Sequence, residues 1–129
     1  MTARKEIRDR VACIIRETKP LLTVYVGDFF SIADDAKPLA AIYFDDGSLE
    51  QQGLKSSIML RSALDIDFFS GIGDDELDSL ADPVIEAVLA DQALRDMSVR
   101  VGYAGFRYSR DEGQGYAALK AMFEFTYVM

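Results

Sequence analysis

Two stretches late in the chain alternate between apolar and polar residues and predict a β-hairpin. They cover residues 99–110 and 116–129 and are joined by a charged turn that contains glycine. In the second stretch the apolar residues share one parity, which indicates one buried face: Leu119, Ala121, Phe123, Phe125, Tyr127 and Met129. In the first, alternation predicts one side with Val99, Val101, Tyr103 and Gly105 and another with Phe106 and Tyr108. A strand of about 13 residues spans roughly 40 Å, which is more edge than a small core needs. The pattern is typical of a subunit in an assembly.

Helical spacing occurs in two other stretches. Residues 3–17 carry apolar side chains at i, i+4, i+7 and i+8, and Pro20 ends the predicted helix. A second helix starts at residues 74–76, where three carboxylates suit the positive end of the helix dipole. Its apolar positions are Leu77, Leu80, Ala81, Val84, Ile85, Val88 and Leu89. Pro83 interrupts them, so we expect a kink there, or a break at which Asp82 caps a new helix.

Three further strands are predicted at residues 21–26, 39–44 and 58–69. The polar residues 45–55 read as a mobile loop or long hairpin connection, and residues 91–97 as a polar linker. In the third strand, Asp65 and Asp67 oppose the apolar side chains and are expected to face solvent. The order α-β-β-β-α-β-β has too few helices for a parallel wound sheet. It predicts an α+β fold in which two main helices pack on one face of a mostly antiparallel or mixed sheet.

The composition fits one globular domain over residues 1–129. Half of the residues are apolar and 28% are charged. The single cysteine, Cys13, lies in the apolar stripe of the first helix and is expected to be a buried thiol. The basic residues near the start are not followed by an apolar segment of a secretory signal, and no stretch has the length of a membrane span. We therefore expect folding in a reducing cytoplasm.

The net charge of −8 is distributed unevenly. Residues 1–19 have six basic and three acidic side chains, while residues 20–129 have eight basic and nineteen acidic ones. One interpretation is an acidic, soluble surface with one basic helix. Another is a bipolar subunit whose basic helix meets an acidic neighbour. The overall sign argues against nonspecific binding of nucleic acid, which requires a dense basic patch.

Residue types needed for common catalytic sites are missing from the sequence. It has no histidine and one cysteine, which removes histidine-based catalysis and most zinc sites. Residues 71–73 (GIG) lie between a strand and a helix, but Glu76 takes the place of the third glycine of a dinucleotide loop. Adjacent aspartates such as Asp45 and Asp46 are typical turn formers and caps. A carboxylate-dependent hydrolase, Asp65 and Asp67 as metal ligands, and weak Mg²⁺ or Ca²⁺ binding by shared carboxylates are the remaining alternatives.

The hairpin resembles the end of the lambda-type phage minor tail protein U family, the tail terminators. The residues that match the family pattern are Gly105, Phe106, Tyr108, Arg110, Asp111, Gly115, Tyr116, Thr126, Tyr127 and Met129. Residues 75–78 (DELD), which open the second helix, and residues 83–84 (PV) within it also match. Helix order and length agree over nearly the whole chain, whereas residues 18–57 are only loosely similar.

This resemblance implies a structural virion protein of the tail, assembled in the host cytoplasm, with no catalytic residues. It implies a homo-hexameric ring, formed from monomers, that caps the tail tube protein, stops its polymerisation and presents a surface to a head-completion or connector protein. No cofactor is required, and Mg²⁺ is expected to have a weak effect on oligomerisation. The alternative is another tail-completion or head–tail connector subunit. We predict that the subunit- or partner-binding residues are Arg107, Tyr108, Arg110, Asp111, Glu112, Asp74 and Asp75, although a charged hairpin tip can also simply be hydrated.

Overall fold

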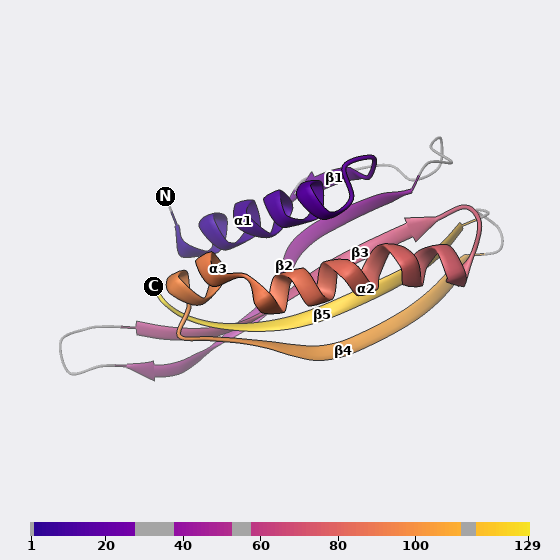
Figure 1. Cartoon of the computed structure of the whole chain (residues 1–129). Coiled ribbons are helices and arrows are strands. Elements are labelled where there is room, and N and C mark those ends of the chain that lie inside the picture. The colour runs from indigo at the N-terminus through magenta and orange to yellow at the C-terminus, as the bar shows by residue number, and fades with distance from the viewer. Residues whose placement is uncertain (1, 28–37, 53–57, 112–115) are drawn as a thin grey trace.

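The computed structural model describes residues 2–27, 38–52, 58–111 and 116–129. Their elements are α1 (Ala3–Thr18), β1 (Thr23–Val26), β2 (Leu39–Gln52), β3 (Ile58–Ser70), α2 (Asp74–Ala90), α3 (Gln92–Met97), β4 (Arg100–Asp111) and β5 (Tyr116–Val128). Figure 1 shows one long, twisted sheet with α1 and α2 side by side on one face. The predicted α+β class and the packing of the two main helices are confirmed.

The five strands are ordered β1-β2-β3-β5-β4. β1 is parallel to β2, and every other neighbouring pair is antiparallel, so the sheet is mixed. The last strand in the sequence therefore lies between β3 and β4. The two faces of this sheet are called the helix face, which contacts α1 and α2, and the opposite face.

The core lies between the helix face and the two long helices. The predicted buried face of β5 is confirmed from Leu119 to Tyr127, because Phe123, Phe125 and Tyr127 are almost fully buried. At the end of the chain the prediction was wrong, because Met129 is exposed and Thr126 is buried. The Tyr127 hydroxyl lies 2.7 Å from the Ser62 hydroxyl, so its one polar atom has a partner. Ile7 of α1 and Leu77 of α2 are also fully buried in this cluster. Burial of each such side chain contributes about 1.5–3 kcal/mol to folding.

α1 begins where the Thr2 side chain accepts a hydrogen bond from the Lys5 backbone N–H. α2 runs without interruption through Pro83, so the predicted break with Asp82 as a new cap was wrong. A proline inside a helix costs about 3 kcal/mol. Burial of Leu77, Val84 and Val88 on the same helix outweighs that cost. None of the helices in the described ranges is long and apolar enough to cross a membrane.

β2 is longer than the sequence pattern predicts. Residues 45–52, expected as a loop, continue the strand, whereas residues 53–55 of that predicted loop lie outside the described residues. The pairing register with β3 shifts between Phe44 and Gly47 and again between Leu49 and Gln51. These irregularities break the period of two, which explains why the stretch did not read as a strand.

Residues 91–97 contain a short helix instead of the predicted polar linker. The Asp91 side chain caps α3 by accepting a hydrogen bond from the Leu94 backbone N–H at 3.0 Å. Leu94 is the single fully buried residue of α3 and packs into the main core. Met97 packs partly buried against the same core. Two apolar contacts in six residues are too few to produce a visible helical period.

Candidate partner-binding surface

β4 forms one edge of the sheet and exposes three aromatic side chains. Among the described strands it pairs with β5 alone. Phe106 is 56% exposed, and Tyr103 and Tyr108 are more than one-third exposed. Exposed aromatic residues on a free strand edge are typical of a protein–protein interface.

A β-bulge places these three aromatic residues on the same face. The register with β5 shifts between Tyr103 and Gly105, and Gly105 has φ of +124°, which suits glycine. Tyr103, Phe106 and Tyr108 then lie opposite Phe123, Ala121 and Leu119, which all point into the core. The expectation that Tyr103 and Phe106 lie on opposite sides was wrong because the bulge adds one residue.

Two polar contacts tie the outer half of β4 to α2. The Tyr108 hydroxyl donates a hydrogen bond to Asp78, and the Arg110 guanidinium forms an ion pair with Asp74. The hydrogen bond to Asp78 raises the pKa of Tyr108 to about 12. The structure thus brings together three of the predicted partner-binding residues: Tyr108, Arg110 and Asp74.

The remaining predicted residues are more scattered. Arg107 is exposed and lies opposite Lys120 on the opposite face of the sheet, away from Tyr108. Asp75 is exposed in the first turn of α2. Asp111 ends β4 next to Tyr116, but its side chain lies outside the described part of the structure, as does the whole of Glu112.

A shallow hollow separates the aromatic residues of β4 from α2. Its volume is about 240 Å³ and it is lined by Asp78, Asp82, Ile85, Tyr103, Phe106, Tyr108 and Leu119. The lining combines apolar rings with two carboxylates. Within it, the Tyr108 hydroxyl donates to Asp78.

The opposite face carries a polar cluster that includes Asp65 and Asp67, which were predicted to face solvent. Asp65 is only 3% exposed, and its carboxylate lies 3.8 Å from the Lys120 ammonium. The Tyr43 hydroxyl donates to Asp67 at 2.7 Å, and the Lys120 ammonium lies 5.6 Å from the centre of the Tyr43 ring. The sequence signal for this cluster is Lys120, the one basic residue of β5, which antiparallel pairing with β3 places opposite Asp67.

Burial raises the pKa of Asp65 and of Asp67, and nearby carboxylates act in the same direction on both. A raised pKa means that ionisation of the carboxyl costs more free energy in the folded state than in the unfolded chain. Ionisation of each aspartate therefore lowers the free energy of unfolding as the pH rises from the ordinary aspartate pKa through the raised pKa.

We expect Asp65→Asn to become more stable relative to the parent protein as pH rises across this window. Asparagine carries no charge to desolvate, so the variant escapes the ionisation cost. Urea unfolding at a series of pH values between 3.5 and 8 measures the difference. Asp75→Asn, at an exposed side chain, is the control. A difference that falls or stays constant with rising pH would contradict the burial of an ionised Asp65.

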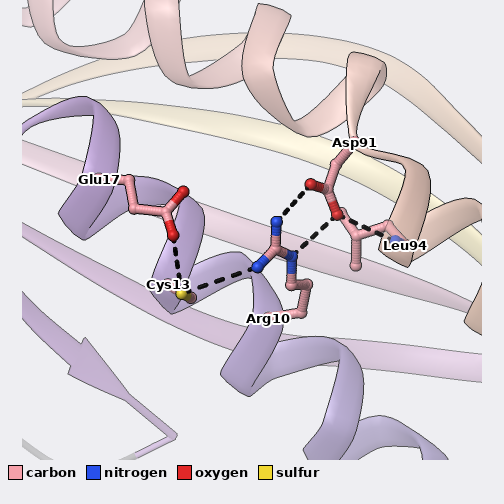
Figure 2. A network of polar contacts seen from close by, with 5 residues as sticks. All are labelled: Arg10, Cys13, Glu17, Asp91 and Leu94. Atoms are coloured by element: carbon pink, nitrogen blue, oxygen red, sulfur yellow. Dashed lines mark hydrogen bonds and ion pairs between the residues drawn. The ribbon is translucent and has the colours of Figure 1, made fainter.

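Arg10 and Asp91 connect α1 to the junction of α2 and α3, as Figure 2 shows. Two guanidinium nitrogens of Arg10 donate to the two carboxylate oxygens of Asp91, at 2.6 and 3.0 Å. This bidentate contact holds the pKa of Asp91 below its usual range. Cys13 lies beside Arg10, and its thiol donates to Glu17 at 3.3 Å. Cys13 is half-buried, so the expectation of a buried thiol was wrong.

The polar clusters do not form a metal centre within the described ranges. There, no three side chains among aspartate, glutamate, cysteine and histidine gather closely enough to hold an ion. Asp65 and Asp67 have Lys120 and Tyr43 as partners, so their arrangement is that of an ion pair and a hydrogen bond.

Comparison with known proteins identifies the family of the chain. No curated protein sequence matches the chain. One matching solved structure is a chain titled "Virion of native gene transfer agent (GTA) particle", with 8% identity and a TM-score of 0.47. That likeness covers 92% of this chain and 84% of the other. The family model of phage minor tail protein U matches residues 2–127, which is nearly the whole sequence. The chain therefore belongs to the phage minor tail protein U family.

Proposed function

We propose that this protein is the tail terminator of a phage or prophage. In this function it assembles as a hexameric ring on the end of the growing tail tube, stops polymerisation of the tube subunit, and then offers a surface to a head-completion or connector protein. The role requires binding surfaces and no catalysis. Membership of the family makes the chain a structural component of the virion tail, and that membership is the observation that carries the proposal.

The shape of the subunit supports assembly into a closed ring. A cyclic ring of identical copies needs two different complementary surfaces on each copy, because each interface joins unlike patches. The sheet has two unlike edges, β1–β2 at one end and β4 at the other. β4 adds exposed aromatic side chains, which bury apolar area readily at an interface.

The proposed partner-binding surface consists of the outer part of β4 and the start of α2: Arg107, Tyr108, Arg110, Asp111, Glu112, Asp74 and Asp75. Exposed carboxylates on neighbouring copies repel one another, and divalent cations screen such repulsion. We therefore expect Mg²⁺ to favour ring formation weakly without being required for the fold.

The experiment that tests this function combines the purified protein with its tube subunit. Native mass spectrometry and negative-stain microscopy, with and without Mg²⁺, measure whether six copies form a ring. Addition of the protein to polymerising tube subunits should then arrest growth and leave a ring at the tube end. A chain that stays monomeric at all concentrations and salts, and does not bind tube ends, would contradict the proposal. Binding to a head connector without arrest of tube growth would instead favour the alternative of a connector or tail-completion subunit.

Arg110→Glu is expected to leave the fold intact and weaken ring formation or docking to partners. Arg110 is exposed and its ion pair with Asp74 is a surface contact, so its loss costs at most about 1 kcal/mol of stability. Reversal of the charge at an interface has a larger effect on association. Thermal unfolding and complementation of tail production measure the two effects. Arg16→Glu, which makes the same charge change on the exposed side of α1, is the matched control. Normal complementation by Arg110→Glu would exclude the docking role.

A further inference from the structure

We propose that neighbouring copies in the ring join by antiparallel pairing of β4 of one copy with residues 43–52 of β2 of the next. This inference rests on the proposed ring and specifies its contact. The occupant of each free strand edge is thus a second copy of the same chain, which extends the sheet from subunit to subunit.

Both strands offer open hydrogen-bonding edges of similar length. Within the described ranges, β1 pairs only with residues Leu39–Ile42 of β2. From Tyr43 to Gln52, β2 pairs with β3 on one side and with none of the other described strands. On the side away from β5, residues Arg100–Asp111 of β4 pair with no strand in the part of the chain that the structure describes. Open edges of this length favour pairing with another chain.

The order of the sheet determines the direction of the proposed pairing. Within one copy, three successive antiparallel pairings connect β2 to β4 through β3 and β5, so β4 runs opposite to β2. When the ring axis runs roughly along the strands, rotation keeps the direction of every β2 along that axis. β4 of one copy therefore meets β2 of the next in antiparallel orientation.

The helix faces of the two edges are complementary in shape. Beside residues 44–49 of β2 lies a hollow of about 380 Å³, lined in part by Phe44, Gly47, Leu49 and Leu60. Arg4 of α1 also lines it, which places the hollow on the helix face. A cavity of about 150 Å³ already holds a benzene molecule. Phe106, 56% exposed on the helix face of β4, is the side chain that fits this hollow in the next copy.

The opposite faces of the two edges are complementary in charge. Arg107 follows Phe106 and therefore points away from the helix face, opposite Lys120. Asp45 follows Phe44 in β2 and is exposed, and it lies near enough to Asp65 to contribute to the raised pKa of that group. In the proposed register Phe106 lies opposite Asp46, which also lines the hollow. The next residue, Arg107, then lies opposite the preceding residue of the antiparallel strand, which is Asp45. One register thus satisfies an apolar contact on one face and an ion pair on the other.

Charge reversal tests this register. Arg107→Asp and Asp45→Arg are each expected to raise the concentration needed for ring formation about tenfold or more. The double variant, which restores an opposite pair, should recover assembly. Phe106→Ala should also weaken the ring, with Ile72→Ala as the matched control because Ile72 is 83% exposed and lies on neither edge. Analytical ultracentrifugation measures assembly, and circular dichroism verifies that each variant is folded.

Disulfide cross-linking provides a second readout. In a Cys13→Ser background, the pair Asp45→Cys and Arg107→Cys should give a ladder of covalent oligomers on oxidation, since directly opposed residues of paired strands fall within disulfide reach. The control pair Arg16→Cys and Arg107→Cys should not. The proposed pairing would be wrong if the wild-type chain forms rings, both single reversals form rings equally well, and the cysteine pair gives no ladder. The ring function would still stand in that case. A wild-type chain that forms no ring at all would overturn the proposed function and this contact with it.

Discussion

Replacement of Phe125 by aspartate is expected to leave no folded protein at 25 °C. Phe125 is fully buried in β5, between Ser62 of β3 and Val101 of β4. Loss of a buried phenylalanine side chain costs about 3–5 kcal/mol. Burial of an unpaired carboxylate adds several kcal/mol more. The sum is comparable to the whole stability of a typical domain, about 5–15 kcal/mol.

Far-ultraviolet circular dichroism and the near-ultraviolet tyrosine signal measure this loss directly. Val128→Asp is the matched control, because Val128 lies in the same strand with its side chain half exposed. That variant should unfold cooperatively with stability close to that of the parent protein, within about 1 kcal/mol. A Phe125→Asp variant that retains a cooperative transition near the parent midpoint would contradict the central position of β5 in the core.

The second large effect is expected for Asp91→Ala, which should lower the free energy of unfolding by about 3 kcal/mol. The Asp91 carboxylate caps α3 through the Leu94 N–H, a contact worth about 1 kcal/mol. It also accepts two charge-assisted hydrogen bonds from Arg10, which contribute about 1.5–3 kcal/mol. Removal of the carboxylate leaves a half-buried guanidinium without its partner.

Urea unfolding at neutral pH measures this loss, and Asp9→Ala is the control. Asp9 forms an exposed pair with Lys5 within α1, which is worth about 0.3–0.5 kcal/mol. Because Arg10 lowers the pKa of Asp91, the stabilisation is complete above the ordinary aspartate pKa and is lost as pH falls through the lowered value. The difference between parent and variant should therefore shrink in acid. A loss below about 1 kcal/mol at pH 7 would show that α1 and α3 do not depend on this contact.

The long, regular elements could be predicted from the sequence because burial on one side imposes a clear period. β5 and α2 both follow such a period. The prediction failed where the cause is not periodic. The bulge at Gly105 moves Phe106 to the side of Tyr103, and two register shifts conceal the second half of β2. α3 depends on a cap and one buried leucine, and these do not produce a recognisable pattern in the sequence.

The arrangement of the candidate surface could be predicted only in part. The charged end of the hairpin was identifiable, and the structure joins Tyr108 and Arg110 to α2. Asp74 was among the predicted residues, but its contact with Arg110 was not, and Asp78 was not predicted at all. Both contacts depend on how α2 lies along β4, which only the tertiary structure defines. Likewise, the contact of Asp65 with Lys120 joins two adjacent strands that are far apart in the sequence, so the neighbours of Asp65 in the chain do not reveal it.

The position of β5 inside the sheet also has a consequence for biosynthesis. β3 pairs with β5 along almost its whole length, yet α2, α3 and β4 are translated between them. Until β5 leaves the ribosome, the apolar side chains of β3 and β4 have no strand between them to complete the core. During this interval the unpaired edge of β3 is exposed and prone to aggregation. The exposure is prolonged because pairing of segments that are distant in the sequence is slow. Pairing of β3 is therefore complete only after β5 has been synthesised, and nascent chains that still lack β5 are candidates for chaperone binding.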